Sequence, residues 1–194
     1  MKLPILQQKN INDFPQFIEY WAKMYNAPND VPYDNSINKE TFTAEDIQKL
    51  YEWKNTSILS GAKQKSLNTK IKSKLMTINN FKSNFDLDKF LKEFENVSFV
   101  WKIFLLHIIK PFEYPIYDQH IHRAYQFIFD EDWQTISAQM KDSAKDNFYF
   151  QTYLPFIKKQ IDSLSLKIRE IDRGLFVFGG NLKRKNLTLP IQLS

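Results

Sequence analysis

The segment from Val97 to Arg123 reads VSFVWKIFLLHIIKPFEYPIYDQHIHR and decides the fold. Its first part, 97–109, is apolar almost all round, which predicts a helix that is buried on every side. The turn at 110–115 contains two prolines and leads to Asp118, whose place before a new apolar period is typical of a helix start. A buried helix, a turn and a second helix predict an all-α core.

Apolar residues recur at spacings of three and four along most of the remaining chain. The pattern predicts helices over about 13–26, 43–55, 67–78, 86–94, 98–109, 118–128, 133–145, 148–164 and 166–178. Gly179-Gly180 is interpreted as a left-handed stop of the last helix. Residues 27–41, with Pro28 and Pro32, are the longest predicted loop, and only the tail, 187–193, has a strand-like pattern.

The predicted architecture is therefore all-α, with about eight helices in a compact two-lobed bundle. We expect a single helical domain over residues 1–194. A second arrangement stays open, in which two lobes share a core. In it, residues of about 44–129 form a central lobe, and the N- and C-terminal helices form the second lobe.

Residue usage excludes several kinds of site. The absence of cysteine excludes disulfides, thiolate zinc sites, iron–sulfur clusters and cysteine nucleophiles. Four glycines, scattered along the chain, exclude the glycine-rich loops that bind dinucleotides or nucleoside triphosphates. His120 and His122 would point about 200° apart on a helix and His107 falls in the buried helix, so no metal site is expected. We expect no cofactor, no metal and no nucleotide.

No segment is suited to a membrane. The longest apolar run, 103–109, is far shorter than the ~20 residues that span a bilayer. Residues 1–9 lack the apolar core of a secretory signal. The sequence therefore predicts a cytoplasmic protein without a membrane partner, and it leaves the oligomeric state open.

Positive charge is concentrated in one stretch. The net charge is +5, and residues 56–85 contain no acidic side chain. The lysines that the helical period places mainly opposite the apolar face of this stretch are Lys63, Lys65, Lys70, Lys72 and Lys74. Two interpretations stay open: a surface that binds an acidic polymer such as DNA, and an ordinary solvated helix face.

The segment Asp118-Gln119-His120-Ile121-His122-Arg123, after a buried helix and a turn, resembles the D-x-H-(V/I)-x-R segment of the helix-hairpin-helix DNA glycosylases. The resemblance covers about residues 87–129. The stretch that corresponds to the family's glycine hairpin, 95–100, contains no glycine, so the chain resembles a divergent member with a degenerate hairpin.

The resemblance implies roles for individual residues. Asp118 would be the catalytic carboxylate that activates water or stabilises the sugar cation as the base leaves; the alternative is that Asp118 only caps a helix. His120 and Arg123 would contact DNA. The family's Schiff-base lysine corresponds to Val100, so no lyase chemistry is expected. Lys102 is assigned to DNA contact, with a displaced nucleophile or a solvated side chain as alternatives.

Trp53 and Asn55 close the second predicted helix. An aromatic ring beside an amide can stack on a flipped base, so the two are candidates for a base pocket, although a half-buried core tryptophan is the alternative.

Two functions stay open for the whole chain. One is a monofunctional hydrolase of DNA repair that cleaves the N-glycosidic bond of a damaged or modified base. The other is a non-catalytic DNA-binding or protein-interaction module on the same scaffold.

Overall fold

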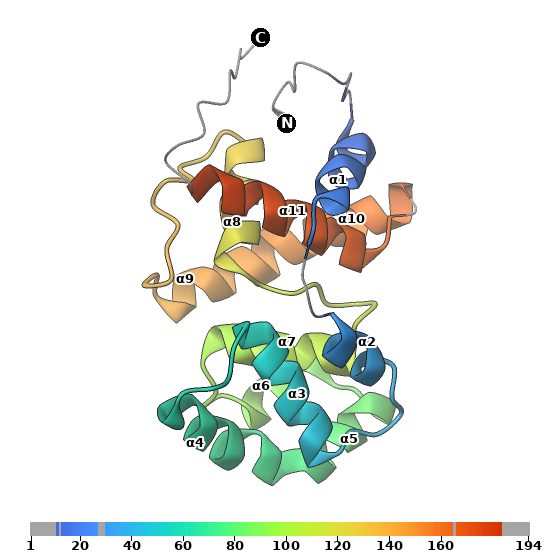
Figure 1. Cartoon of the computed structure of the whole chain (residues 1–194), viewed down its shortest axis with the longest axis vertical. Helices are drawn as coiled ribbons and strands as arrows, with labels where there is room; N and C mark the ends of the chain where they lie inside the picture. Colours follow the sequence, from blue (N-terminus) through green and yellow to red (C-terminus); the bar gives the residue numbers. More distant parts are fainter. Residues whose placement is uncertain (1–10, 12, 27–29, 165, 184–194) are drawn as a thin grey trace. The chain divides into compact units, whose positions relative to one another are not determined.

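The computed structural model describes residues 11, 13–26, 30–164 and 166–183, and the regular elements of this part of the chain are all helical (Figure 1). The predicted all-α class is confirmed for these residues. Two features that the sequence singled out lie outside the described residues: the N-terminal stretch 1–9 and the strand-like tail at 187–193.

The chain divides into two compact units. The first unit combines Met1–Asn26 with Pro115–Ser194, and the second unit is the intervening stretch Ala27–Tyr114. This division differs from a central lobe of about 44–129, because α8 (Gln119–Ile128) packs against α11 (Ile168–Lys183) and so belongs to the first unit. Each unit is described below by itself.

The first unit contains a helix from the start of the chain and helices from its second half. They are α1 (Phe14–Lys23), α8 (Gln119–Ile128), α9 (Asp142–Asn147), the π-helical turn η2 (Phe148–Tyr153), α10 (Leu154–Leu164) and α11 (Ile168–Lys183). α11 packs against both α1 and α8 (Figure 1). The ring centroid of Phe178 lies 5.0 Å from that of Phe17 and 5.2 Å from that of Trp21. These aromatic contacts join α11 to α1.

Two glycines let α11 approach its neighbours closely. A methyl group at Gly179 would lie 1.8 Å from the backbone oxygen of His120 on α8, and one at Gly174 would lie 3.0 Å from the oxygen of Ile18 on α1. The predicted stop at Gly179-Gly180 is wrong: α11 continues to Lys183, and neither glycine has a positive φ. Gly179 is required for backbone approach rather than for a turn.

The second unit contains the remaining helices. They are α2 (Val31–Ile37), α3 (Ala44–Asn55), α4 (Gly61–Lys70), the 3₁₀ turn η1 (Lys72–Lys74), α5 (Leu75–Ser83), α6 (Leu87–Glu93) and α7 (Phe99–Ile109). α7 is the predicted buried helix, and Ile103 to Ile109 are all buried. Tyr51 of α3 packs on it: the Tyr51 hydroxyl donates to the Trp101 carbonyl oxygen at 3.0 Å.

Local sequence explains where several helices begin. Asp13 caps α1 by accepting from the Gln16 backbone N–H at 2.8 Å. Thr43 and Asp46 form a reciprocal capping box at the start of α3. Asp86 accepts from the Lys89 backbone N–H at 2.9 Å at the start of α6. Each cap satisfies a backbone donor that the first helical turn leaves without an intrahelical partner.

Three secondary-structure predictions, one of a loop and two of helices, are wrong in part. α2 lies inside the stretch 27–41 that was predicted to be a loop; Pro32 is compatible with its first turn, and the buried ring of Tyr33 anchors it. The predicted helix 67–78 is divided at Ile71, where the backbone leaves helical geometry and a 3₁₀ turn follows. Of the predicted helix 133–145, only the part from Asp142 onward is helical.

Candidate functional site

Asp118 marks the start of α8 and is the centre of the candidate site. Its backbone is extended (φ −145°, ψ 151°), and its carboxylate accepts a hydrogen bond from the His120 backbone N–H at 2.9 Å. The side chain is half-buried. A carboxylate in this position faces the positive end of the helix dipole, which favours its ionised form.

The peptide between Pro115 and Ile116 is fixed by hydrogen bonds on both sides. The Tyr149 hydroxyl donates to the Pro115 carbonyl oxygen at 2.7 Å. The Ile116 N–H donates to Asp172 Oδ2 at 3.0 Å, and the Tyr153 hydroxyl donates to Asp172 Oδ1 at 3.2 Å. Asp172 lies on α11 and is 1% exposed. This peptide comes two residues before Asp118, so side chains of α11 and η2 together fix the backbone that leads into α8.

Sequence reasoning missed these supporting residues. The signal for Asp172 was its register: with Ile168, Ile171 and Leu175 it occupies the spacing of an apolar helical stripe. A carboxylate at such a position must find donors inside the protein. Nothing in the spacing of Tyr149 and Tyr153 indicated that their hydroxyls would donate to the Pro115 carbonyl oxygen and to Asp172, respectively.

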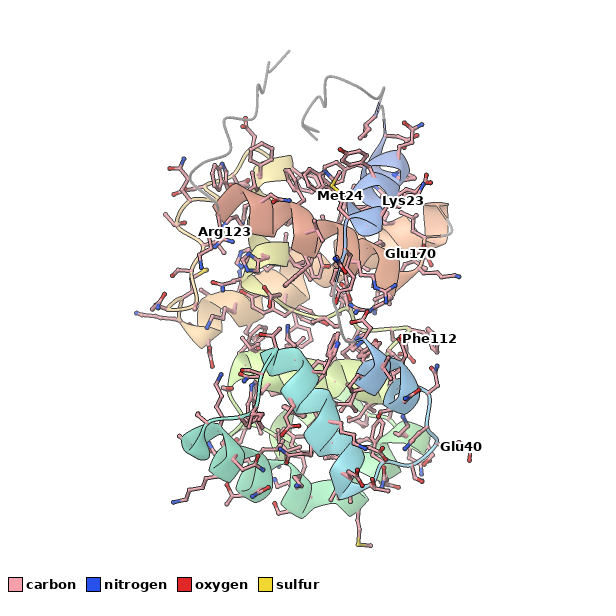
Figure 2. All side chains as sticks on the ribbon, in the orientation of Figure 1. Lys23, Met24, Glu40, Phe112, Arg123 and Glu170 are labelled. Carbon is pink, nitrogen blue, oxygen red and sulfur yellow. The ribbon has the colours of Figure 1, made fainter. Side chains whose placement is uncertain are left out.

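Arg123 does not lie where the resemblance implied. It is 4% exposed, and its guanidinium donates to the carbonyl oxygens of Ile136 at 2.7 Å and Gly179 at 3.3 Å (Figure 2). Burial lowers the pKa of Arg123, and Asp118 opposes this shift. Its donors are directed to internal carbonyls, so the prediction that Arg123 contacts DNA is wrong: it joins α8 to α11.

His120 is half-buried and lies against α11. Arg123 donates to its Nδ1 at 3.0 Å, and its ring meets the edge of Phe176 at a centroid distance of 5.3 Å. Because a guanidinium has no acceptor, His120 Nδ1 is the acceptor of this bond. Burial lowers the pKa of His120, Arg123 acts in the same direction, and Asp118 opposes both. His120 is therefore mainly neutral at pH 7, which weakens its use as a phosphate-binding cation.

Tyr117 and His122 form a buried pair beside Asp118. The Tyr117 hydroxyl lies 3.0 Å from His122 Nδ1, and the His122 ring stacks on Phe148 at a centroid distance of 3.5 Å. Burial lowers the pKa of His122 to about 4. Burial also raises the pKa of Tyr117, and the charges of Asp118 and Asp142 add to that shift. Both groups are neutral at pH 7, so Asp118 lies next to a neutral aromatic cluster.

The lysine candidates lie in the second unit, on α4 and η1. Lys63, Lys65 and Lys70 are exposed. Lys72 and Lys74 are half-buried: Lys72 Nζ donates to Gln48 Oε1 at 3.2 Å, and Lys74 Nζ lies 2.9 Å from Glu93 Oε1. The carboxylate of Glu93 offsets the charge of Lys74. Three of the five lysines thus remain exposed cations. Lys63 and Lys70 lie on one side of α4 and Lys65 points about 200° away from Lys63, and we call these three the exposed α4 lysines.

Trp53 does not present a free ring. Its ring is half-buried, with the Tyr33 ring centroid at 4.5 Å and the Phe104 centroid at 5.9 Å, and its Nε1 donates to Asp30 Oδ1 at 3.0 Å. The Tyr33 and Phe104 rings favour the alternative of a half-buried core tryptophan, and stacking of Trp53 on a flipped base stays a prediction. Asn55 donates to the Ser57 carbonyl oxygen at 3.1 Å and accepts from Lys63 Nζ.

Tyr33 reaches the buried helix α7 through its hydroxyl, which lies 2.7 Å from His107 Nε2. His107 Nδ1 lies 2.7 Å from the Tyr114 carbonyl oxygen. A carbonyl only accepts, so Nδ1 carries the proton and Nε2 accepts from Tyr33. His107 is thus a satisfied core side chain that anchors α2.

The predicted site residues fall into two groups in different units. Asp118, His120 and Arg123 belong to the first unit. The candidates in the second unit are Trp53, Asn55, Lys63, Lys65, Lys70, Lys72, Lys74 and the half-buried Lys102 on α7. Within the first unit the structure brings Asp118, His120 and Arg123 together at the start of α8.

Searches for related proteins return nothing: no family model, no curated protein and no solved structure matches the chain. In the described part of the chain, no three histidine, cysteine, aspartate or glutamate side chains are grouped so that they could hold a metal ion. Over the same residues, no helix combines the length and the apolar character that a membrane span requires.

Proposed function

We propose that this chain is a DNA glycosylase-like protein that hydrolyses the N-glycosidic bond of a damaged or modified base, with Asp118 as its catalytic carboxylate. The observation that carries the proposal is the setting of Asp118: a half-buried carboxylate at the start of α8, with one backbone donor at 2.9 Å. The D-x-H-I-x-R segment, which resembles that of the helix-hairpin-helix glycosylases, supports the same assignment.

The chemistry needs an ionised carboxylate near the sugar. As the bond between sugar and base breaks, positive charge develops on the sugar ring, and a carboxylate stabilises that charge or removes a proton from the attacking water. The hydrogen bonds at Pro115 and Ile116 favour this use of Asp118, because a fixed backbone holds the carboxylate in place. No lysine nucleophile takes part, so the proposed reaction is monofunctional.

DNA would be held mainly by the exposed α4 lysines. Lys63, Lys65 and Lys70 are exposed and lie on a helix without acidic side chains. Lysine ammonium groups bind backbone phosphates without reading sequence, which suits an enzyme that searches duplex DNA for a lesion. Arg123 has a different role in this proposal: it stabilises the junction of α8 with α11.

The test is release of free base from a panel of lesion-bearing duplexes by the purified chain and by Asp118→Asn. Asparagine caps a helix about as well as aspartate, so this variant removes the charge and keeps the cap. We expect release to fall by at least about 100-fold, the range typical of lost acid–base catalysis. Asp13→Asn is the matched control, since it makes the same change at the cap of α1 in the same unit. Equal release by the parent and Asp118→Asn would contradict the proposal, as would inactivity of the parent across the panel.

A second candidate function is DNA binding without catalysis. It is favoured by the stretch 95–100, which lacks the glycines through which a hairpin approaches a phosphate, while Lys63, Lys65 and Lys70 remain exposed. Its signature is salt-dependent binding to undamaged duplex that Asp118→Asn leaves unchanged, together with no base release. Absence of binding at low salt would count against both candidates.

A further inference from the structure

α4 packs less of its surface into the core of the second unit than α3 does. Of its residues Gly61–Lys70, only Leu67 is buried. α3, by comparison, buries Ile47, Leu50 and Tyr51. Most of the stability of a helix in a protein comes from the packing of an apolar face, rather than from its own backbone hydrogen bonds. α4 therefore receives little of the stabilisation that α3 receives.

The local sequence of α4 does not compensate for this weak packing. Ser60, at its N-cap, makes no side-chain hydrogen bond to the first turn, whereas Thr43 and Asp46 form a capping box on α3. The helix has 10 residues, GAKQKSLNTK, and its glycine, serine, asparagine and threonine have a lower helix propensity than alanine. Isolated helices shorter than ~12–15 residues are marginal in water even with favourable sequences. α4 thus depends on the few tertiary contacts that it makes.

The charge of α4 also acts against the helix. It has three lysines and no acidic side chain, so its own sequence contains no partner of opposite charge. Lys63 donates to Asn55 Oδ1, and Lys70 donates to the Asn96 carbonyl oxygen at 2.8 Å. These acceptors are neutral, so they leave the net charge of the helix unchanged. A bound anion would reduce the repulsion among the lysines, which a neutral acceptor does not.

The contacts of α4 with α3 are hydrogen bonds between side-chain amides. Gln64 Nε2 donates to Gln48 Oε1 at 2.9 Å, and Gln48 Nε2 donates to Gln64 Oε1 at 2.7 Å. Such bonds are exchanged for bonds to water when the helix opens, so their net contribution is modest. A segment with few buried apolar contacts is the kind that opens locally while the rest of a domain stays folded.

We propose that α4 opens locally in the free protein and that the phosphate backbone of DNA stabilises it, so that DNA binding and the folding of α4 are coupled. Phosphates at the exposed α4 lysines reduce the repulsion that opposes the helix. A segment that becomes ordered on binding can adapt to the surface of its partner. The coupling to DNA rests on the proposed function, whereas the local opening of the free helix does not.

The first measurement is amide hydrogen exchange of the full chain without DNA, followed by NMR. α3 buries three apolar side chains and α4 buries one, and burial of one such side chain shifts an equilibrium by about tenfold or more. After correction for intrinsic exchange rates, we expect the Leu67 amide of α4 to be protected at least about tenfold less than the Leu50 amide of α3. Equal protection of the two amides would overturn the proposal.

The second measurement adds an undamaged DNA duplex at low salt, with binding followed by fluorescence anisotropy in the same buffer. A ligand that binds only the folded helix slows its opening by about 100-fold at 100 times the dissociation constant. We expect exchange of the Leu67 amide to slow by at least about tenfold. Bound duplex with unchanged Leu67 exchange would overturn the coupling and leave the proposed function standing. Absence of binding would contradict both.

Gly61→Ala tests α4 without changing its charge. Gly61 does not have a positive φ, and no atom outside the local backbone lies within 4 Å of an added β-carbon, so alanine fits. Because alanine restricts the unfolded segment, exchange of the Leu67 amide should slow by about two- to fivefold. Gly180→Ala, in the other unit, is the control and should leave this rate unchanged. An unchanged rate in Gly61→Ala would show that the Leu67 amide does not exchange through opening of α4, which would contradict the proposal.

Discussion

Residues 115–123 of the first unit and residues 61–74 of the second unit use polar side chains in opposite ways. Around 115–123 the polar groups face inward: Asp172, His122 and Arg123 are buried and hydrogen bonded. Along 61–74, Lys63, Lys65 and Lys70 are exposed. A buried polar group that loses its partner costs about 1–3 kcal/mol, whereas most surface substitutions change stability by less than about 0.5 kcal/mol. Substitutions in the first region should therefore affect stability, and those in the second should affect binding.

The strongest test of this contrast is Gly179→Ala. A β-carbon at this position would lie 1.8 Å from the His120 backbone oxygen, so α8 and α11 must separate. We expect a loss of at least about 3 kcal/mol in the free energy of unfolding, at the upper end for overpacking. Chemical denaturation measures it. Gly180→Ala is the matched control: its nearest neighbour is 3.9 Å away, so the better helix propensity of alanine should stabilise α11 by up to about 1 kcal/mol. Equal stability of the two variants would contradict the close approach.

A somewhat smaller loss is expected for Asp172→Ala. The substitution leaves the Ile116 N–H and the Tyr153 hydroxyl without their acceptor inside the protein, at a cost of about 2–3 kcal/mol. Glu170→Ala, an exposed change on the same helix, should cost less than about 0.5 kcal/mol (Figure 2). Faster hydrogen exchange of the Ile116 amide in Asp172→Ala would locate the effect. If the two variants were equally stable, the inward-facing region would not differ from the surface.

The buried His122 predicts how stability changes with pH. Its folded-state pKa of about 4 lies below the value near 6.5 of an unfolded chain, so the unfolded chain binds the proton first as the pH falls. The stabilisation is complete above pH 6.5 and is lost as the pH falls toward 4. Between pH 7 and pH 5 the loss from this group is about 2 kcal/mol. Urea titrations of the parent and of His122→Phe should show that the variant loses less stability over this interval; parallel pH profiles would contradict the assignment.

The smallest effect on stability, and the largest on binding, is expected in the second unit. Replacing Lys63, Lys65 and Lys70 together by glutamine should change the free energy of unfolding by less than about 0.5 kcal/mol per site. If these lysines bind DNA, the salt dependence of binding should decrease by about one unit of slope for each lysine that contacts a phosphate. Fluorescence anisotropy at several salt concentrations measures this slope. Lys89→Gln with Lys92→Gln on α6 is the control pair, and an equal decrease in slope there would show that DNA does not prefer the exposed α4 lysines.

Most helices were predictable because their signals are local. Apolar periodicity and capping side chains at Asp13, Thr43 and Asp86 mark helix starts that need no distant partner. α2 was not predictable, because its anchor is the contact of Tyr33 with His107, 74 residues away. The glycine pair at 179–180 was misinterpreted for the same reason. A glycine that ends a helix and one that admits a neighbouring backbone are identical in sequence.

The candidate site was predictable in its centre and not in its surroundings. The proline-led segment correctly placed Asp118 at a helix start. Arg123 was assigned to the surface because its sequence neighbours do not show that the carbonyls of Ile136 and Gly179 surround it. The packing of Trp53 was equally unpredictable, since the two rings that pack on it come from α2 and α7.

The discontinuous make-up of the first unit has a consequence for synthesis on the ribosome. α1 is made early, but its aromatic partner Phe178 is translated only after the whole of the second unit and most of the first. Until then the apolar stripe of α1, with Phe17 and Trp21, has no helix to cover it, and a nascent chain with such a stripe is open to chaperones and to aggregation. A stop codon before α11 should therefore be far more harmful to the yield of soluble chain than the small number of lost residues would indicate.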